Sequence, residues 1–279
     1  MKILGLIPCL MVDNNREVNS KAMDFFKNSY QVDKIAVCDQ EFKPEDYKDG
    51  FEYIGRHDKR IGFASARNEL LSYFYNSDYD YALWMDANGS FTKTSLNSLL
   101  TVLKNLREGT LDFDVCLSTL GIINSGERMA DKKRDDYFET ATLVPVSGSY
   151  RWFHGMIMKN FKKHYNLELY CQGNNFEGVP EDTYFVMLLR RYFTTYLCSD
   201  LTVSKPSNNA STWMNSKDSY AYPPTDFKKI DRMIEEAVPP GQRKIREFSN
   251  VVYLERVEEH KDELKSFVSR KKKQEYELF

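Results

Sequence analysis

The chain has 279 residues, with 39 Lys and Arg against 41 Asp and Glu and a formal net charge of -2. This length allows one large domain or two small ones. A composition with 42% apolar and 14% aromatic residues excludes a disordered chain. The near-neutral charge excludes a protein that binds polyanions over its whole surface, so contact with nucleic acid would need a local basic patch.

The first apolar run, residues 3–10, predicts a buried strand. With Lys2 before it, the run could be mistaken for a signal peptide or a lipoprotein site. It is short, however, no small-x-small site follows, and Pro8 stands directly before Cys9, where a small residue is wanted. No stretch approaches the roughly 18 apolar residues of a membrane span. We therefore expect a cytoplasmic protein.

Strand-like and helix-like patterns then alternate as far as residue 119. Short apolar runs predict strands over 34–38, 50–54, 81–85 and 113–119, and helical spacing predicts helices over 19–28, 65–75 and 94–106. This alternation predicts an α/β fold with a mainly parallel sheet and right-handed crossovers.

The second half of the chain departs from this pattern. Residues 122–139 are polar and turn-rich and predict a long loop, followed by a strand near 142–146 and a helix over 182–192. The last forty residues mix both signs of charge. We expect one α/β domain over 1–222 and a charged helical extension over 223–279.

The cysteines and histidines do not show the sequence spacing of common metal-binding motifs. The five cysteines are odd in number and lack CxxC spacing, and the four histidines show neither HxxxH nor HxH. This favours reduced core thiols without disulfides or zinc. GxGxxG, GxxxxGK[ST] and GxSxG are also missing, which disfavours dinucleotide, P-loop and serine-hydrolase chemistry.

Polar residues end several predicted strands, and ligands of open α/β sheets bind beyond the carboxyl ends of strands. They are Pro8, Cys9, Asp39, Asp86, Asn88 and Thr119. Asp39 could accept hydrogen bonds from a base or ribose, although an Asp at this place is often a helix cap. Asp86 and Asn88 offer two hard oxygen ligands for Mg²⁺ or Mn²⁺.

Two helix starts are further candidates. In GFASARN, Arg67 and the free N–H groups of the helix would favour a diphosphate; alternatively Ser65 caps the helix and Arg67 lies on the surface. Glu181 and Asp182 open a later helix. They either complement the helix dipole or supply a general base.

Taken in order, IPC, VCDQ, GFASARNELL, LWMDANGSF and VPEDTYFVMLLR resemble the GT-A family of nucleotide-sugar glycosyltransferases, over roughly residues 1–200. DAN stands where the family has its Asp-x-Asp motif, and the Glu-Asp pair stands where inverting members keep their base. The resemblance implies a GT-A, Rossmann-like fold. Residues 1 to about 120 would form the donor-binding half and about 121–222 the acceptor half.

The resemblance also implies roles for single residues. Donor binding would fall to Pro8, Cys9, Asp39, Arg67, Asn68, Asp86 and Asn88. Of these, Asp39 would contact uracil, and Asp86 with Asn88 would hold a divalent cation on the diphosphate. Asp182 would be the base, supported by Glu181. Asn88 replaces the family's second carboxylate, and no His follows the Asp182 helix at the place where many members supply a third ligand. The metal requirement is therefore left open.

The acceptor side would include Trp152 and His154, where an aromatic ring stacks on a sugar, although Trp152 could equally be a core residue. The Lys-, Asn-, Tyr- and Phe-rich composition suits an AT-rich genome such as that of a T-even phage. The small size and soluble build are similar to those of phage DNA glucosyltransferases of the T2/T6 type. These transfer glucose from UDP-glucose to glucosyl-hydroxymethylcytosine in duplex DNA, here through a β linkage. Lys132, Lys133 and Arg134 would then contact phosphates. The alternatives are a surface-glycan glycosyltransferase and a nucleotide-binding module without turnover.

Overall fold

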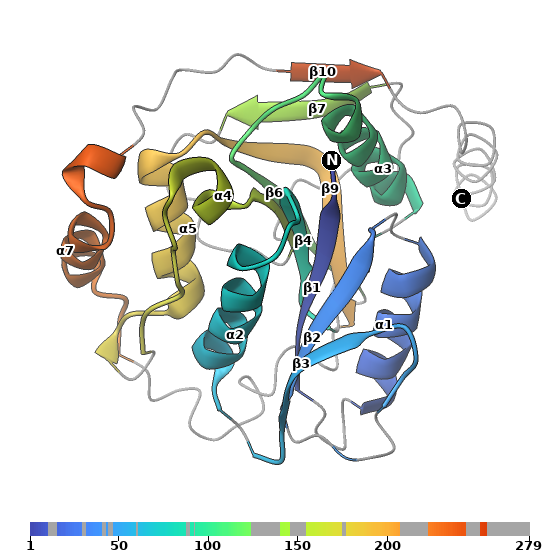
Figure 1. Cartoon of the computed structure of the whole chain (residues 1–279), viewed down its shortest axis with the longest axis horizontal. Coiled ribbons are helices and arrows are strands. Elements are labelled where there is room, and N and C mark those ends of the chain that lie inside the picture. Colours follow the sequence, from blue (N-terminus) through green and yellow to red (C-terminus); the bar gives the residue numbers. More distant parts are fainter. Residues whose placement is uncertain are drawn as a thin grey trace, which may run out of the picture.

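A mixed β-sheet with helices on both faces forms the centre of the computed structural model (Figure 1). The structure describes residues 1–10, 16–29, 32–40, 43, 47–59, 61–87, 90–91, 93–123, 140–145, 155–174, 177–206, 223–243 and 252–255. Within these ranges no helix is long and apolar enough to cross a membrane.

The described strands form a 10-stranded sheet in the order β10-β7-β9-β6-β8-β4-β1-β2-β3, with β5 paired to β9. Their bounds are β1 (Ile3–Leu10), β2 (Lys34–Gln40), β3 (Glu52–His57), β4 (Tyr81–Met85), β5 (Ser90–Phe91), β6 (Val115–Ile123), β7 (Thr140–Pro145), β8 (Gly155–Lys159), β9 (Thr195–Pro206) and β10 (Val252–Glu255). Strands β3, β2, β1 and β4 run parallel, and β8 joins antiparallel between β4 and β6. The predicted α/β fold is confirmed.

Helices cover the two faces of the sheet as separate groups. The helices are α1 (Arg16–Ser29), α2 (Phe63–Tyr75), α3 (Lys93–Glu108), the short α4 (Phe161–Tyr165), α5 (Glu181–Tyr192) and α7 (Phe227–Ala237), with a 3-10 turn η5 (Pro240–Gln242). Apolar residues of α2, α5 and α7 share one core cluster with the sheet, whereas α1 and α3 contribute to a second cluster. Figure 1 shows the two groups apart.

The α2 helix shows why the local pattern folds this way. Ala66, Leu70, Leu71 and Phe74 recur at helical spacing and are all fully buried. The strand β4 follows the same logic, because all five of its residues are buried between helices on both faces. The predicted bounds of β4 match the structure, since a continuous apolar run ends abruptly at Asp86.

The C-terminal segments join the main core. Ile230 and Ile234 of α7 are fully buried and belong to the same cluster as α2 and α5. Strand β10 pairs antiparallel with β7 and extends the sheet at its edge. The residues expected to form a helical extension thus supply one helix and one strand to the domain.

One boundary predicted from the sequence was wrong. Residues 122 and 123 were assigned to a loop, but they end β6, where Ile122 pairs with Lys205 and Ile123 with Pro206. Ile122 and Ile123 are apolar and continue the pairing with β9, so the strand ends just before the sequence turns polar at Asn124. Residues 124–139 of the predicted loop lie outside the described residues.

Candidate active site

The carboxyl ends of the central parallel strands bring several predicted site residues to one edge of the sheet. Pro8 lies beside Cys38, and Cys9 lies beside Asp39, in the register of β1 with β2. The parallel pairing of β1 with β4 brings Asp86, which directly follows β4, to the same edge. Of Asp39 only the backbone position is described.

Arg67 is the centre of an ion-pair cluster at this edge. Its Nη1 donates a hydrogen bond to Glu181 Oε1 at 3.1 Å, and its Nη2 lies 3.5 Å from Asp86 Oδ1. The Arg67 side chain is 6% exposed, so the reading of Arg67 as a surface residue is wrong. Ser65 does not cap the helix either, because α2 begins at Phe63 with Gly62 as its N-cap residue. The structure thus joins three sequence-predicted residues, which lie on α2, directly after β4 and on α5.

The three charged groups stabilise one another. Burial disfavours the guanidinium charge of Arg67, but the carboxylates of Asp86 and Glu181 outweigh burial and hold the pKa of Arg67 above its ordinary value. Asp182 adds to the same effect. Among these described side chains, the three carboxylates of Asp86, Glu181 and Asp182 outnumber the one buried cation, Arg67.

A backbone segment docked on α2 carries the start of α5 to Arg67. Asn68 Nδ2 donates to the carbonyl of Cys171 at 2.9 Å, and the Cys171 N–H donates to Asn68 Oδ1 at 2.8 Å. Two turns further along α2, the Tyr75 hydroxyl donates to the Leu169 carbonyl at 2.8 Å. These bonds fix the segment against the helix face that bears Arg67.

Asn68, for which the resemblance implies donor binding, also makes two hydrogen bonds within the fold. Because both polar atoms of its amide bond the backbone of Cys171, Asn68 positions the segment that leads to Glu181. Burial also raises the pKa of the Cys171 thiol to about 12, and Arg67 opposes this shift. Sequence reasoning missed Cys171, since no local pattern reports a contact made by its backbone.

A tight turn then reverses the chain into α5. Gly173 has φ 141°, and a Cβ there would lie 2.3 Å from the Val179 carbonyl oxygen, so only glycine fits. Glu181 and Asp182 form the first turn of α5. Asp182 Oδ1 accepts a hydrogen bond from the Thr183 N–H at 2.6 Å. Both carboxylates therefore lie at the positive end of the helix dipole.

Several predicted residues lie outside the described part of the chain. They are Asn88, Lys132, Lys133, Arg134, Trp152 and His154.

The basic residue Arg243, by contrast, forms hydrogen bonds within the fold. Its Nη2 donates to the Glu235 carbonyl at 2.7 Å and its Nε donates to the Val238 carbonyl at 3.0 Å, which caps the end of α7.

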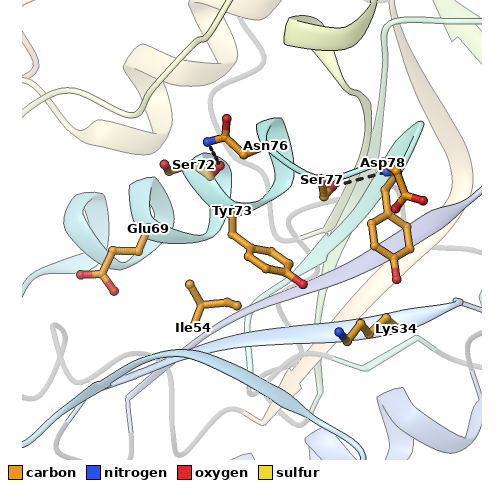
Figure 2. A pocket seen from close by; sticks show the side chains of 9 residues that line it. Lys34, Ile54, Glu69, Ser72, Tyr73, Asn76, Ser77 and Asp78 are labelled. Atoms are coloured by element: carbon orange, nitrogen blue, oxygen red, sulfur yellow. Dashed lines mark hydrogen bonds between the residues drawn. The ribbon is translucent and has the colours of Figure 1, made fainter.

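A separate groove of about 680 Å³ runs along α2 (Figure 2). Its lining extends from Glu69 along the helix to Tyr79, with Lys34 and Ile54 on the strand side. Lys34 begins β2 and Tyr79 precedes β4, so most of the groove lies toward the amino ends of the strands. It contains none of the site residues predicted from the sequence and is distinct from the Arg67 cluster.

The fold is the GT-A, Rossmann-like arrangement that the sequence predicts. It is similar to solved structures of Staphylococcus aureus TarS 1–349: one in complex with UDP-GlcNAc (TM-score 0.53, 18% identity) and one in complex with UDP (TM-score 0.51, 17% identity). Each match covers 85% of this chain, which spans 66% and 65% of the two TarS chains. No protein-family model matches the chain, and no curated protein matches it by sequence.

Proposed function

We propose that this chain is an inverting glycosyltransferase that transfers a sugar from a UDP-sugar donor to a hydroxyl acceptor. The observation that carries the proposal is the cluster of Arg67, Asp86 and Glu181, next to Asp182, at the carboxyl edge of the parallel strands. Ligands of open α/β sheets bind at this edge. Support also comes from the likeness in fold to TarS structures solved with UDP and UDP-GlcNAc.

The donor diphosphate would lie beside Asp86, where the surrounding carboxylates oppose a second negative group. A divalent cation resolves this conflict, and the carboxylate of Asp86, 17% exposed, is a donor type that Mn²⁺ and Mg²⁺ prefer. Asp86 and Asn88 would hold the ion. When bound, it would supply positive charge to the departing UDP. Pro8, Cys9 and Asp39 would face the nucleoside.

Asp182 is the proposed general base. Glu181 is held by the Arg67 guanidinium, whereas Asp182 lies one residue further along the first turn of α5. Asp182 would take the proton of the acceptor hydroxyl while that oxygen attacks the anomeric carbon. The bond from this carbon to the UDP oxygen breaks on the opposite side, so the configuration inverts. Arg67 positions Glu181 and Asp86 and keeps their charges compensated.

For the donor sugar and the acceptor we propose glucose and the glucosyl-hydroxymethylcytosine of duplex DNA. This finer proposal rests on the composition and small size of the chain, which are similar to those of phage DNA glucosyltransferases. Lys132, Lys133 and Arg134 would bind phosphates, and Trp152 with His154 would face the acceptor sugar. DNA binding of this kind weakens with rising salt, because each phosphate contact releases counterions.

A UDP-release assay tests both levels of the proposal. The full chain would be incubated with UDP-glucose or UDP-GlcNAc, with and without Mn²⁺, and with plain duplex DNA, hydroxymethylcytosine DNA or glucosylated hydroxymethylcytosine DNA. Release from UDP-glucose with the glucosylated DNA alone is the expected result. If the chain binds UDP but releases none from the donor with any of the DNAs, DNA is not the acceptor. The chain would then act on a glycan, or bind the nucleotide without turnover. Absence of UDP binding would refute the glycosyltransferase proposal.

A further inference from the structure

Three potential metal ligands from three elements meet near the carboxyl edge of the parallel strands. Cys38 lies on β2, His57 ends β3, and Glu69 lies on α2. The Cys38 thiol donates to Glu69 Oε2 at 3.3 Å, and His57 Nε2 lies 2.9 Å from the same oxygen. All three ligand atoms lie within 4.8 Å of one another. We name these residues the Cys38 cluster.

The spacing of these atoms is close to that of a tetrahedral metal site. With Zn–S near 2.3 Å and Zn–N and Zn–O near 2.0–2.2 Å, the ligand atoms of zinc stand about 3.4–3.6 Å apart. The S–O and N–O distances here are 3.3 and 2.9 Å. The third pair, Cys38 Sγ and His57 Nε2, lies within 4.8 Å, so side-chain adjustments of roughly 0.5–1 Å would bring all three atoms to the zinc spacing. Thiolate, imidazole and carboxylate are also the ligand types that zinc takes.

Gly55 leaves room for the cluster. A Cβ at this position would lie 2.2 Å from Glu69 Oε2, 2.7 Å from His57 Nε2 and 2.9 Å from Cys38 Sγ. Gly55 has no left-handed backbone that would call for glycine, because the positive-φ glycines are at other positions. The missing side chain instead lets the three ligand groups converge above the backbone of β3.

The exposure of the cluster suits an ion better than an organic substrate. Cys38 is fully buried, so an electrophilic carbon could not reach its sulfur. The side chains of His57 and Glu69 are 28% and 37% exposed and open a short path for a small cation. Glu69 also lies at one end of the α2 groove (Figure 2). An ordinary ion pair between His57 and Glu69 would explain why these two side chains lie together. It would not explain why the Cys38 thiol contacts the same carboxylate oxygen.

We propose that Cys38, His57 and Glu69 bind one zinc ion through Sγ, Nε2 and a carboxylate oxygen, with water at the fourth position. Binding would release the thiol proton to solvent and leave the thiolate on the metal. The ion would tie β2 and β3 to α2 next to Asp39. This site is separate from the proposed Asp86–Asn88 site, which has only oxygen ligands, and it does not depend on the identity of the donor or acceptor.

Cobalt(II) provides a direct test, because only a thiolate ligand gives a sulfur-to-cobalt charge-transfer band. The reduced, metal-free full chain would be titrated with Co²⁺ and then with Zn²⁺, and absorption would be followed. Three variants would be compared: Cys38→Ala, His57→Ala and the control Cys116→Ala, which removes a buried thiol from the other core cluster. Circular dichroism would check that each variant is folded.

We expect one Co²⁺ per chain, a charge-transfer band, and displacement by Zn²⁺. Cys38→Ala should abolish the band, His57→Ala should weaken Co²⁺ binding at least about tenfold, and Cys116→Ala should leave both unchanged. Because His57 is partly exposed, His57→Ala remains informative if Cys38→Ala does not fold. No band in the unmodified chain, or undiminished affinity in His57→Ala, would overturn the proposal.

Discussion

Replacing Arg67 by Met would test whether the buried ion-pair cluster holds the site together. At an effective dielectric constant near 20, unit charges 3.1 and 3.5 Å apart attract by about 5 kcal/mol each. Desolvation of the guanidinium offsets much of this attraction. Removing one partner of a buried pair nevertheless costs about 3–5 kcal/mol, because the other charges are left buried and uncompensated. Arg67→Met should therefore lower the free energy of unfolding by that amount.

Urea unfolding at neutral pH would measure this loss. In thermal unfolding, a loss of 3 kcal/mol should lower the Tm of a chain of this length by roughly 5 °C. Arg191→Met is the matched control. It removes a cation of α5 that pairs with Asp231 at the surface and is 33% exposed. Such pairs contribute at most about 1 kcal/mol. An Arg67→Met variant as stable as Arg191→Met would refute the reasoning.

A double-mutant cycle would separate the ion pair from packing. Glu181→Gln removes the charge that Arg67 compensates at 3.1 Å while keeping the shape of the side chain. Combined with Arg67→Met, it should recover about 1–3 kcal/mol of the loss, as expected for residues in direct contact. Strict additivity of the two substitutions would mean that their charges do not interact.

Three further predictions follow from the site. Asp182→Asn should lower turnover at least about 100-fold while UDP affinity stays nearly unchanged, and a variant that keeps most of its activity would exclude Asp182 as the base. Asn68→Ala should lower the free energy of unfolding in urea by about 2–3 kcal/mol, because it leaves the backbone N–H and carbonyl of Cys171 without the hydrogen bonds of Asn68. The control Asn76→Ala, at an exposed residue at the end of α2, should lower it by less than about 1 kcal/mol. Since burial raises the pKa of Cys171 from 9.0 to about 12, the folded chain keeps a proton that the unfolded chain loses. Its stability relative to Cys171→Ala should therefore fall as pH rises above about 9, and parallel stability curves from about pH 8 to about 11 would contradict this assignment.

The sequence by itself determined most elements of the first half of the chain and the edge at which the candidate site lies, but not the strands β5, β8, β9 and β10. Apolar runs such as YALWM fold locally as buried strands, and the stripe through Ala66, Leu70 and Phe74 folds as a helix. Since parallel strands end at a common edge, the residues that follow them could be placed together without knowledge of any contact. Asp86, the residue after β4, is the clearest case.

Only the tertiary structure decided which side chains touch. Arg67 and Glu181 are 114 positions apart, and Asn68 and Cys171 are 103 apart. Their meeting depends on how the segment before α5 docks on α2, and no periodicity carries that information. The Cys38 cluster escaped prediction for the same reason: its ligands come from two neighbouring strands and a helix, so sequence spacing could not reveal them. A local pattern predicts a helix or strand because the interactions that favour it join residues close in sequence. A site depends instead on the packing that brings distant elements together.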